Sequence, residues 1–190
     1  MSDKSNHIRT SQIVIRQHDK PFRGASYVCQ IARRIKNATH YLIRNEKMPN
    51  GKPLSHSDAD KWLKQHNHEL YNKLPSAFAQ RMTQIAGAEW KSFYEAHKGF
   101  AKQPARYKAK PKPPRYANKA TTIHIGRNGF RVDGGTVYFA CDVIPPIKTH
   151  YSFTQNWNAK VTILPRNSTQ LVKLFLRHFR RENNAHTLTF

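Results

Sequence analysis

The chain has 190 residues, which is enough for one large domain or two small ones. Its 33 Lys and Arg residues face only 11 Asp and Glu residues, giving a formal net charge of +22. A compact domain with this excess repels itself unless a polyanion neutralises it, so we expect a nucleic-acid partner and salt-sensitive binding. The sequence has no long apolar run, signal peptide or basic amphipathic terminal helix to favour a membrane partner.

Hydrophobic residues make up 38% of the chain and aromatic residues 11%, so a packed core is expected and wholesale disorder is not. The two cysteines, Cys29 and Cys141, lie far apart, and no CxxC pair occurs. This pattern argues against a disulfide framework and a zinc ribbon, and it favours a reducing cytoplasm.

The N-terminal region is predicted to form a strand and then a helix. Residues 12–16 form a short segment rich in β-branched side chains, which predicts a strand. A turn at 19–21 should end it. Between Ser26 and Arg44 the apolar residues recur at steps of three and four, which predicts a helix. A polar stripe lies elsewhere on this helix and consists of Arg33, Asn37, His40 and Arg44.

Two more helices are expected after a turn at 48–53. Ser57 or Asp58 is the predicted cap of a helix that carries Trp62, Leu63 and Leu70. The pair Pro75–Ser76 should begin a third helix that ends near Lys98–Gly99. Aromatic residues on this helix have helical spacing and are predicted to be core residues: Phe78, Trp90, Phe93 and Tyr94.

Residues 99–119 contain no acid and are predicted to form an extended basic connector, because four prolines forbid a regular helix there. Its cations are Lys102, Arg106, Lys108, Lys110, Lys112, Arg115 and Lys119. We expect them to neutralise phosphates, with Tyr107 or Tyr116 stacking on bases. The alternative is a solvated linker whose aromatic rings pack on the protein itself.

Strands are predicted after the connector, at 121–125, 130–132, 137–139 and 160–164. Residues 171–178 fit either a strand paired with 186–190 or a helix. The order of strand, helices and then strands predicts an α+β fold, a β-barrel interrupted by a helical insertion.

Three stretches together resemble one family. Residues 32–44 have an Arg-rich start and an Asn-x-x-x-Tyr core, and residues 74–94 contain Leu-Pro, Gln80 and a Trp-Lys-Ser-Phe run. Residues 104–116 are similar to a basic Pro-Lys-Phe-Lys signature. In this order they resemble the TnpB/OrfB proteins of bacterial insertion sequences, the ancestors of type V CRISPR effectors.

The resemblance implies an architecture and a function. A wedge-type, OB-like barrel would start at 8–22, be interrupted by a helical recognition lobe at 23–98 and the connector at 99–119, and resume at 120–190. The chain would be the guide-RNA- and target-DNA-binding module of an RNA-guided system from a mobile element, acting near the nucleoid in a prokaryotic cytoplasm. Guide pairing would read the sequence, while the protein reads backbone shape and a short flanking DNA motif.

Site residues follow from the same resemblance. Arg33, Arg34 and Arg44 would line a channel for the guide–target heteroduplex, or they form an exposed helix face; both alternatives stay open. Ser76 and Gln80 match positions that touch the flanking DNA motif in the family, and Gln can pair bidentately with adenine. We expect DNA contact for Gln80, whereas Ser76, where the family often has Lys, fits better as an N-cap.

A RuvC nuclease domain needs three acidic ligands, and after Asp142 the only acid is Glu182. We therefore expect no catalytic residue, metal site or cofactor on this chain. The alternatives are one piece of a split or truncated RNA-guided endonuclease that needs a RuvC-containing partner, and a guide-independent DNA-binding regulator.

Overall fold

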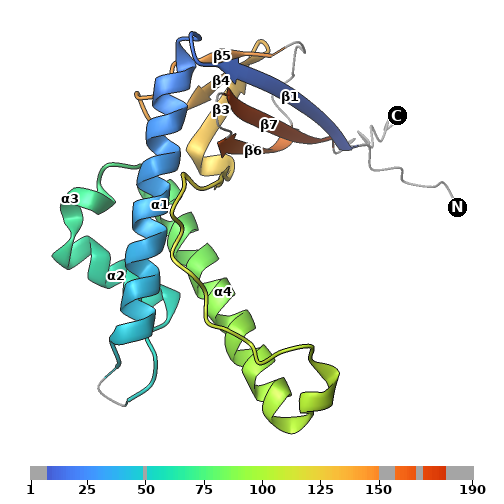
Figure 1. The fold of residues 1–190 in the computed structure, drawn as a ribbon. Coiled ribbons are helices and arrows are strands. Elements are labelled where there is room, and N and C mark those ends of the chain that lie inside the picture. Colours follow the sequence, from blue (N-terminus) through green and yellow to red (C-terminus); the bar gives the residue numbers. More distant parts are fainter. Residues whose placement is uncertain (1–7, 49–50, 150–156, 166–168, 179–190) are drawn as a thin grey trace, which may run out of the picture.

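The computed structural model describes residues 8–48, 51–149, 157–165 and 169–178. Its helices and small antiparallel sheets form an α+β fold, which confirms the predicted class. The long helices α1 (Pro21–Asn45) and α4 (Ser76–Lys102) pack against each other and extend away from the sheets (Figure 1). Between them in the sequence lie α2 (His56–His66) and the short α3 (His68–Tyr71).

The ends of two helices differ from the prediction. Ser55, not Ser57 or Asp58, caps α2, and Asp58 completes a capping box by accepting the backbone N–H of Ser55 at 3.1 Å. The third helix does not end at Gly99 but continues to Lys102, followed by the 3₁₀ turn η1 (Pro104–Arg106). Only the part of the connector from Gln103 onward is therefore free of α-helix.

One sheet joins the two ends of the described chain. Its strand order is β1 (Ile8–Arg16), β7 (Thr169–His178), β6 (Trp157–Pro165) and β2 (Ile123–Ile125). The first strand pairs with one beyond Thr121, as a sheet interrupted by a helical insertion requires: Ile13 lies opposite Val172. Residues 171–178 are thus a strand; their proposed partner, 186–190, lies outside the described residues.

The remaining strands form a second sheet, of β3 (Phe130–Asp133), β4 (Thr136–Phe139) and β5 (Ile147–Lys148), after the 3₁₀ turn η2 (Arg127–Gly129). A closed barrel was predicted, but the described strands form two open sheets. In the larger sheet β1 and β2 are opposite edges, and no pairing within the described residues joins them.

A single buried cluster connects the helices with the sheets. Phe78 of α4 and Ile35 of α1 are almost fully buried, as are Ile123 of β2 and Ile163 of β6. The aromatic prediction is confirmed: Trp90 is buried with Phe78, and Phe93 and Tyr94 pack partly buried against this core. This core fixes α1 and α4 relative to each other. It thereby positions the connector, which follows α4 in the sequence and runs back between the two helices (Figure 1).

None of the described helices combines the length and the apolar character needed to cross a membrane.

Candidate nucleic-acid interface

The basic connector starts by folding back on the end of α4. The ring of Tyr107 lies edge-on to Phe100, with 5.8 Å between the ring centroids. Its hydroxyl reaches the backbone at Gly99, where a Cβ atom would collide with it. Tyr107 therefore packs on the protein, which is the second of the two alternatives that the sequence left open for its ring.

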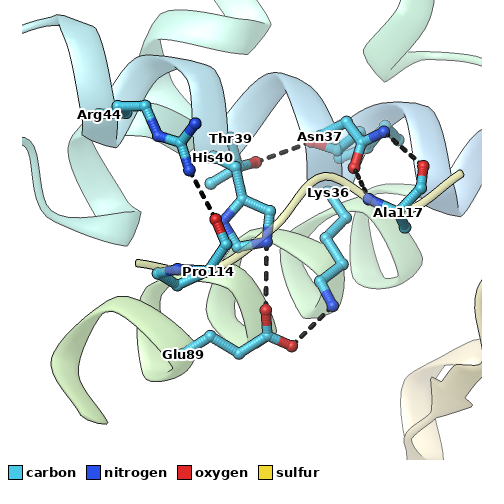
Figure 2. A network of polar contacts seen from close by, with 9 residues as sticks. Lys36, Asn37, Thr39, His40, Arg44, Glu89, Pro114 and Ala117 are labelled. Carbon is cyan, nitrogen blue, oxygen red and sulfur yellow. Dashed lines mark hydrogen bonds and ion pairs between the residues drawn. The ribbon is translucent and has the colours of Figure 1, made fainter. Parts of the chain in front are cut away.

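Three polar side chains of α1 then hold the connector backbone, and we call them the clasp: Arg33, Asn37 and Arg44. Figure 2 shows two of them, Asn37 with Ala117 and Arg44 with Pro114. Arg44 Nη2 donates to the Pro114 carbonyl at 2.6 Å, and Arg33 Nη1 donates to the Asn118 carbonyl at 3.1 Å. Between them, Asn37 donates to the Ala117 carbonyl at 2.9 Å and accepts from the Ala117 N–H at 2.8 Å.

The clasp explains the polar stripe in the sequence of α1. Positions 33, 37 and 44 lie on one side of the helix because they are separated by about one and two helical turns. A proline-containing segment such as 111–114 forms no helix or strand that would use its carbonyls, so these remain available as acceptors. The side chains of α1 thereby form hydrogen bonds with backbone groups of a segment that belongs to no sheet.

Arg44 also binds through its planar guanidinium group. The Cζ atom lies 4.9 Å from the ring centroid of Tyr116 and 5.7 Å from that of Trp90. Tyr116 remains 44% exposed, so part of its ring is open to solvent while Arg44 stacks on it. The guanidinium group of Arg44 thus contacts other parts of the protein, and its interaction with the two rings holds the connector at Tyr116.

A polar group around the buried His40 lies beside the clasp, with Lys36 and Glu89 partly exposed (Figure 2). The Nζ atom of Lys36 is 2.6 Å from Glu89 Oε1, and His40 Nε2 is 3.1 Å from Glu89 Oε2. His40 is fully buried, and this burial lowers its pKa below the ordinary 6.5; Glu89 opposes the shift, and Lys36 and Arg44 add to it. Burial therefore favours the neutral form of His40, and the group links α1 to α4.

The cationic side chains of the connector remain in solvent. Each of them is exposed: Lys102, Arg106, Lys108, Lys110, Lys112, Arg115 and Lys119. Arg34 of α1 is exposed as well. We call residues 102–119 the basic ribbon, because α1 holds its backbone while its charges face water, with no acidic residue within the segment.

Ser76 and Gln80 lie at the other end of α4 from the start of the basic ribbon. Pro75 occupies the N-cap position, and no side chain caps this helix, so the prediction that Ser76 is an N-cap is wrong. Pro75 fits there because proline brings a fixed φ and lacks the N–H that a helix start leaves unpaired. Ser76 and Gln80 are both exposed, one turn apart.

Sequence reasoning missed Asn37, His40 and Glu89 as part of this site. Asn37 and His40 were visible in the polar stripe, but their partners are a backbone amide and a distant carboxylate, which composition does not reveal. Within the described residues, His, Cys, Asp and Glu side chains do not gather in groups of three or more that could hold a metal ion.

No family model matches the chain, and no curated protein has a significantly similar sequence.

Proposed function

We propose that this chain binds nucleic acid, as the guide-RNA- and target-DNA-binding module of a TnpB-like RNA-guided system. The observation that carries the proposal is the basic ribbon. Its backbone is held by hydrogen bonds from Arg33, Asn37 and Arg44, while its Lys and Arg side chains stay exposed.

This arrangement suits phosphate binding for two physical reasons. A backbone that is already fixed in the free protein loses less conformational entropy when it binds, so more of the contact energy appears as affinity. Each phosphate that the ribbon neutralises also releases condensed counterions, which favours binding at low salt. A net charge of +22 adds long-range attraction for a polyanion.

The TnpB-like part of the proposal rests on the resemblance and on the order of the elements. A strand precedes the helices, the basic ribbon follows them, and β1 pairs with β7 across this helical insertion. That order agrees with the layout of a wedge interrupted by a recognition lobe, and we include an OB-like wedge in the proposal. DNA cleavage is assigned to a RuvC-containing partner, and the site of action to the prokaryotic cytoplasm near the nucleoid.

The deciding experiment is to purify the chain from cells, sequence the RNA that co-purifies, and measure its affinity over a range of salt concentrations. We expect one defined RNA to be enriched, with an affinity that falls steeply as salt rises. Tight binding to duplex DNA with no retained RNA would favour the guide-independent regulator instead. Failure to bind any nucleic acid at 50 mM salt would refute the proposal.

Cleavage is tested separately. The purified chain, supplied with its RNA and Mg²⁺, is expected to leave target DNA intact, because the acidic ligands of a RuvC site were not found in its sequence. Guided, metal-dependent cleavage by a preparation free of contaminating nuclease would contradict this assignment.

A further inference from the structure

A groove of about 690 Å³ runs between α4 and the basic ribbon, open to solvent along one side. Its α4 side includes three small residues at four-residue spacing, Ala88, Ser92 and Ala96, with Phe93 beside them. Its other side is formed by Pro111 and Pro114 of the ribbon. Small side chains of α4 thus face two prolines, and the clasp holds one of them, Pro114, by its carbonyl.

The groove combines an apolar lining with a basic rim. Lys112 lines it, and the neighbouring Lys110 and Arg115 are exposed on the same short segment of the ribbon. One acid, Glu89, also lines the groove, but its carboxylate oxygens already contact Lys36 and His40. The local surface is therefore apolar where it is hollow and positively charged at its edge.

We propose that this groove holds an unpaired nucleobase of a single-stranded nucleic acid, with Lys112 and its cationic neighbours binding the flanking phosphates. The inference rests on the proposed function and deepens it by naming a base-binding site. A base has two apolar faces that can lie against Phe93 and the prolines, and the strand that carries it is a polyanion that matches the rim.

Base binding in the groove also agrees with the positions of the two tyrosines of the basic ribbon, which already contact other parts of the protein. Tyr107 and Tyr116 were predicted to stack on bases, but Tyr107 packs on Phe100, and Arg44 covers part of Tyr116. An apolar peptide would suit the walls of the groove, but it would leave the cations of the rim without a counter-charge. The charge of the rim therefore favours a nucleotide over a peptide as the occupant.

The test fills the groove without changing charge. Ser92→Leu adds bulk at an exposed position of α4 inside the groove, and Ala88→Leu does so one turn earlier. Ala101→Leu is the matched control, because Ala101 is exposed on the same helix but does not line the groove. Affinity of the full chain is measured by fluorescence anisotropy for labelled 12-nucleotide RNA and DNA single strands, and for versions with abasic linkers.

We expect Ser92→Leu and Ala88→Leu to weaken binding of base-carrying strands by about fivefold or more, with an unchanged salt slope and unchanged binding of abasic strands. Ala101→Leu should bind like the original chain, and circular dichroism should show that all three variants are folded. The RNA and DNA arms show which strand is preferred.

If the folded groove-filling variants bind base-carrying strands normally, the base site is refuted while the proposed function stands. Equal weakening for abasic strands also refutes it, because the groove then binds backbone. If the original chain binds no strand at all, both proposals fall.

Discussion

The side-chain amide of Asn37 binds both backbone polar groups of Ala117, donating to its carbonyl at 2.9 Å and accepting from its N–H at 2.8 Å. The two residues are 80 positions apart in the sequence. One side chain on α1 thus fixes the conformation of the basic ribbon where it passes the helix. The first prediction follows from this contact.

Asn37→Ala should lower the free energy of unfolding by about 1–3 kcal/mol, because it leaves two partly buried backbone groups of Ala117 unpaired. Asn45→Ala is the control, since the amide of Asn45 is exposed and bonds within its own helix, to the Tyr41 carbonyl. Urea unfolding measures both. Equal losses in the two variants would show that Asn37 does not hold the ribbon.

Replacing Lys108, Lys110 and Lys112 with Ala should flatten the salt dependence of RNA binding. If all three contact phosphates of a single strand, the log–log slope falls by about 2, near 0.7 for each contact. Lys20, Lys61 and Lys73 serve as the control triple, because they are exposed but lie outside the ribbon. An identical change in slope for both triples would mean that only net charge matters.

Tyr107→Ala should destabilise the protein by about 1–2 kcal/mol, because the ring packs on Phe100 and on the backbone of Gly99. The salt slope of RNA binding should stay the same, since no cation is removed. Thermal unfolding and anisotropy titrations check the two halves of this prediction. A loss of affinity without a loss of stability would indicate that the ring stacks on a base after all.

Gly24→Ala should be strongly destabilising, by about 2 kcal/mol or more. A Cβ atom at this position of α1 would overlap the backbone carbonyl of Val143 and lie 3.1 Å from the Cα atom of Ile144, and backbone cannot yield as a side chain can. Gly126→Ala is the control, because a Cβ atom there meets no heavy atom within 4 Å. Similar unfolding midpoints for both variants would contradict the close packing at Gly24.

The stability of the protein should fall as the pH is lowered from 7.5 to 5. His40 has a folded-state pKa below 6.5, so the unfolded chain binds its proton first, and this favours unfolding as the pH drops through about 6.5. His40→Gln removes this titration and should make the slope of unfolding free energy against pH shallower. An unchanged slope, measured by urea unfolding at each pH, would remove His40 as a contributor.

Local patterns predicted the two long helices and the first strand, but the single helix expected to carry Trp62, Leu63 and Leu70 is divided into α2 and α3. The apolar spacing from Val28 to Leu42 corresponds to the buried face of α1, and β-branched residues mark β1. The helix end at Gly99 was predicted wrongly, because glycine is a usual helix stop but here its bare backbone gives room for the ring of Tyr107. A tertiary contact thus overrides a local preference.

Long-range partners could not be predicted from the sequence. The stripe of Arg33, Asn37 and Arg44 was recognised as polar, but its partners are main-chain groups of residues 114–118, and every residue has such groups. Residues 171–178 fitted a helix as well as a strand until their pairing with β1 and β6 decided the question. Pairing between distant segments is set by the whole fold and not by either segment alone.

The pairing of β1 with β7 has a consequence for how the protein folds as it is made. Ile13 leaves the ribosome long before Val172, so β1 is synthesised well before the strand with which it pairs. The helices α1 to α4 are close together in the sequence and are all synthesised before β7. Contacts between such distant segments carry a large loop-closure cost and form slowly. We therefore expect the helical part to pack first and the pairing of β1 with β7, which joins the ends of the described chain, to form late.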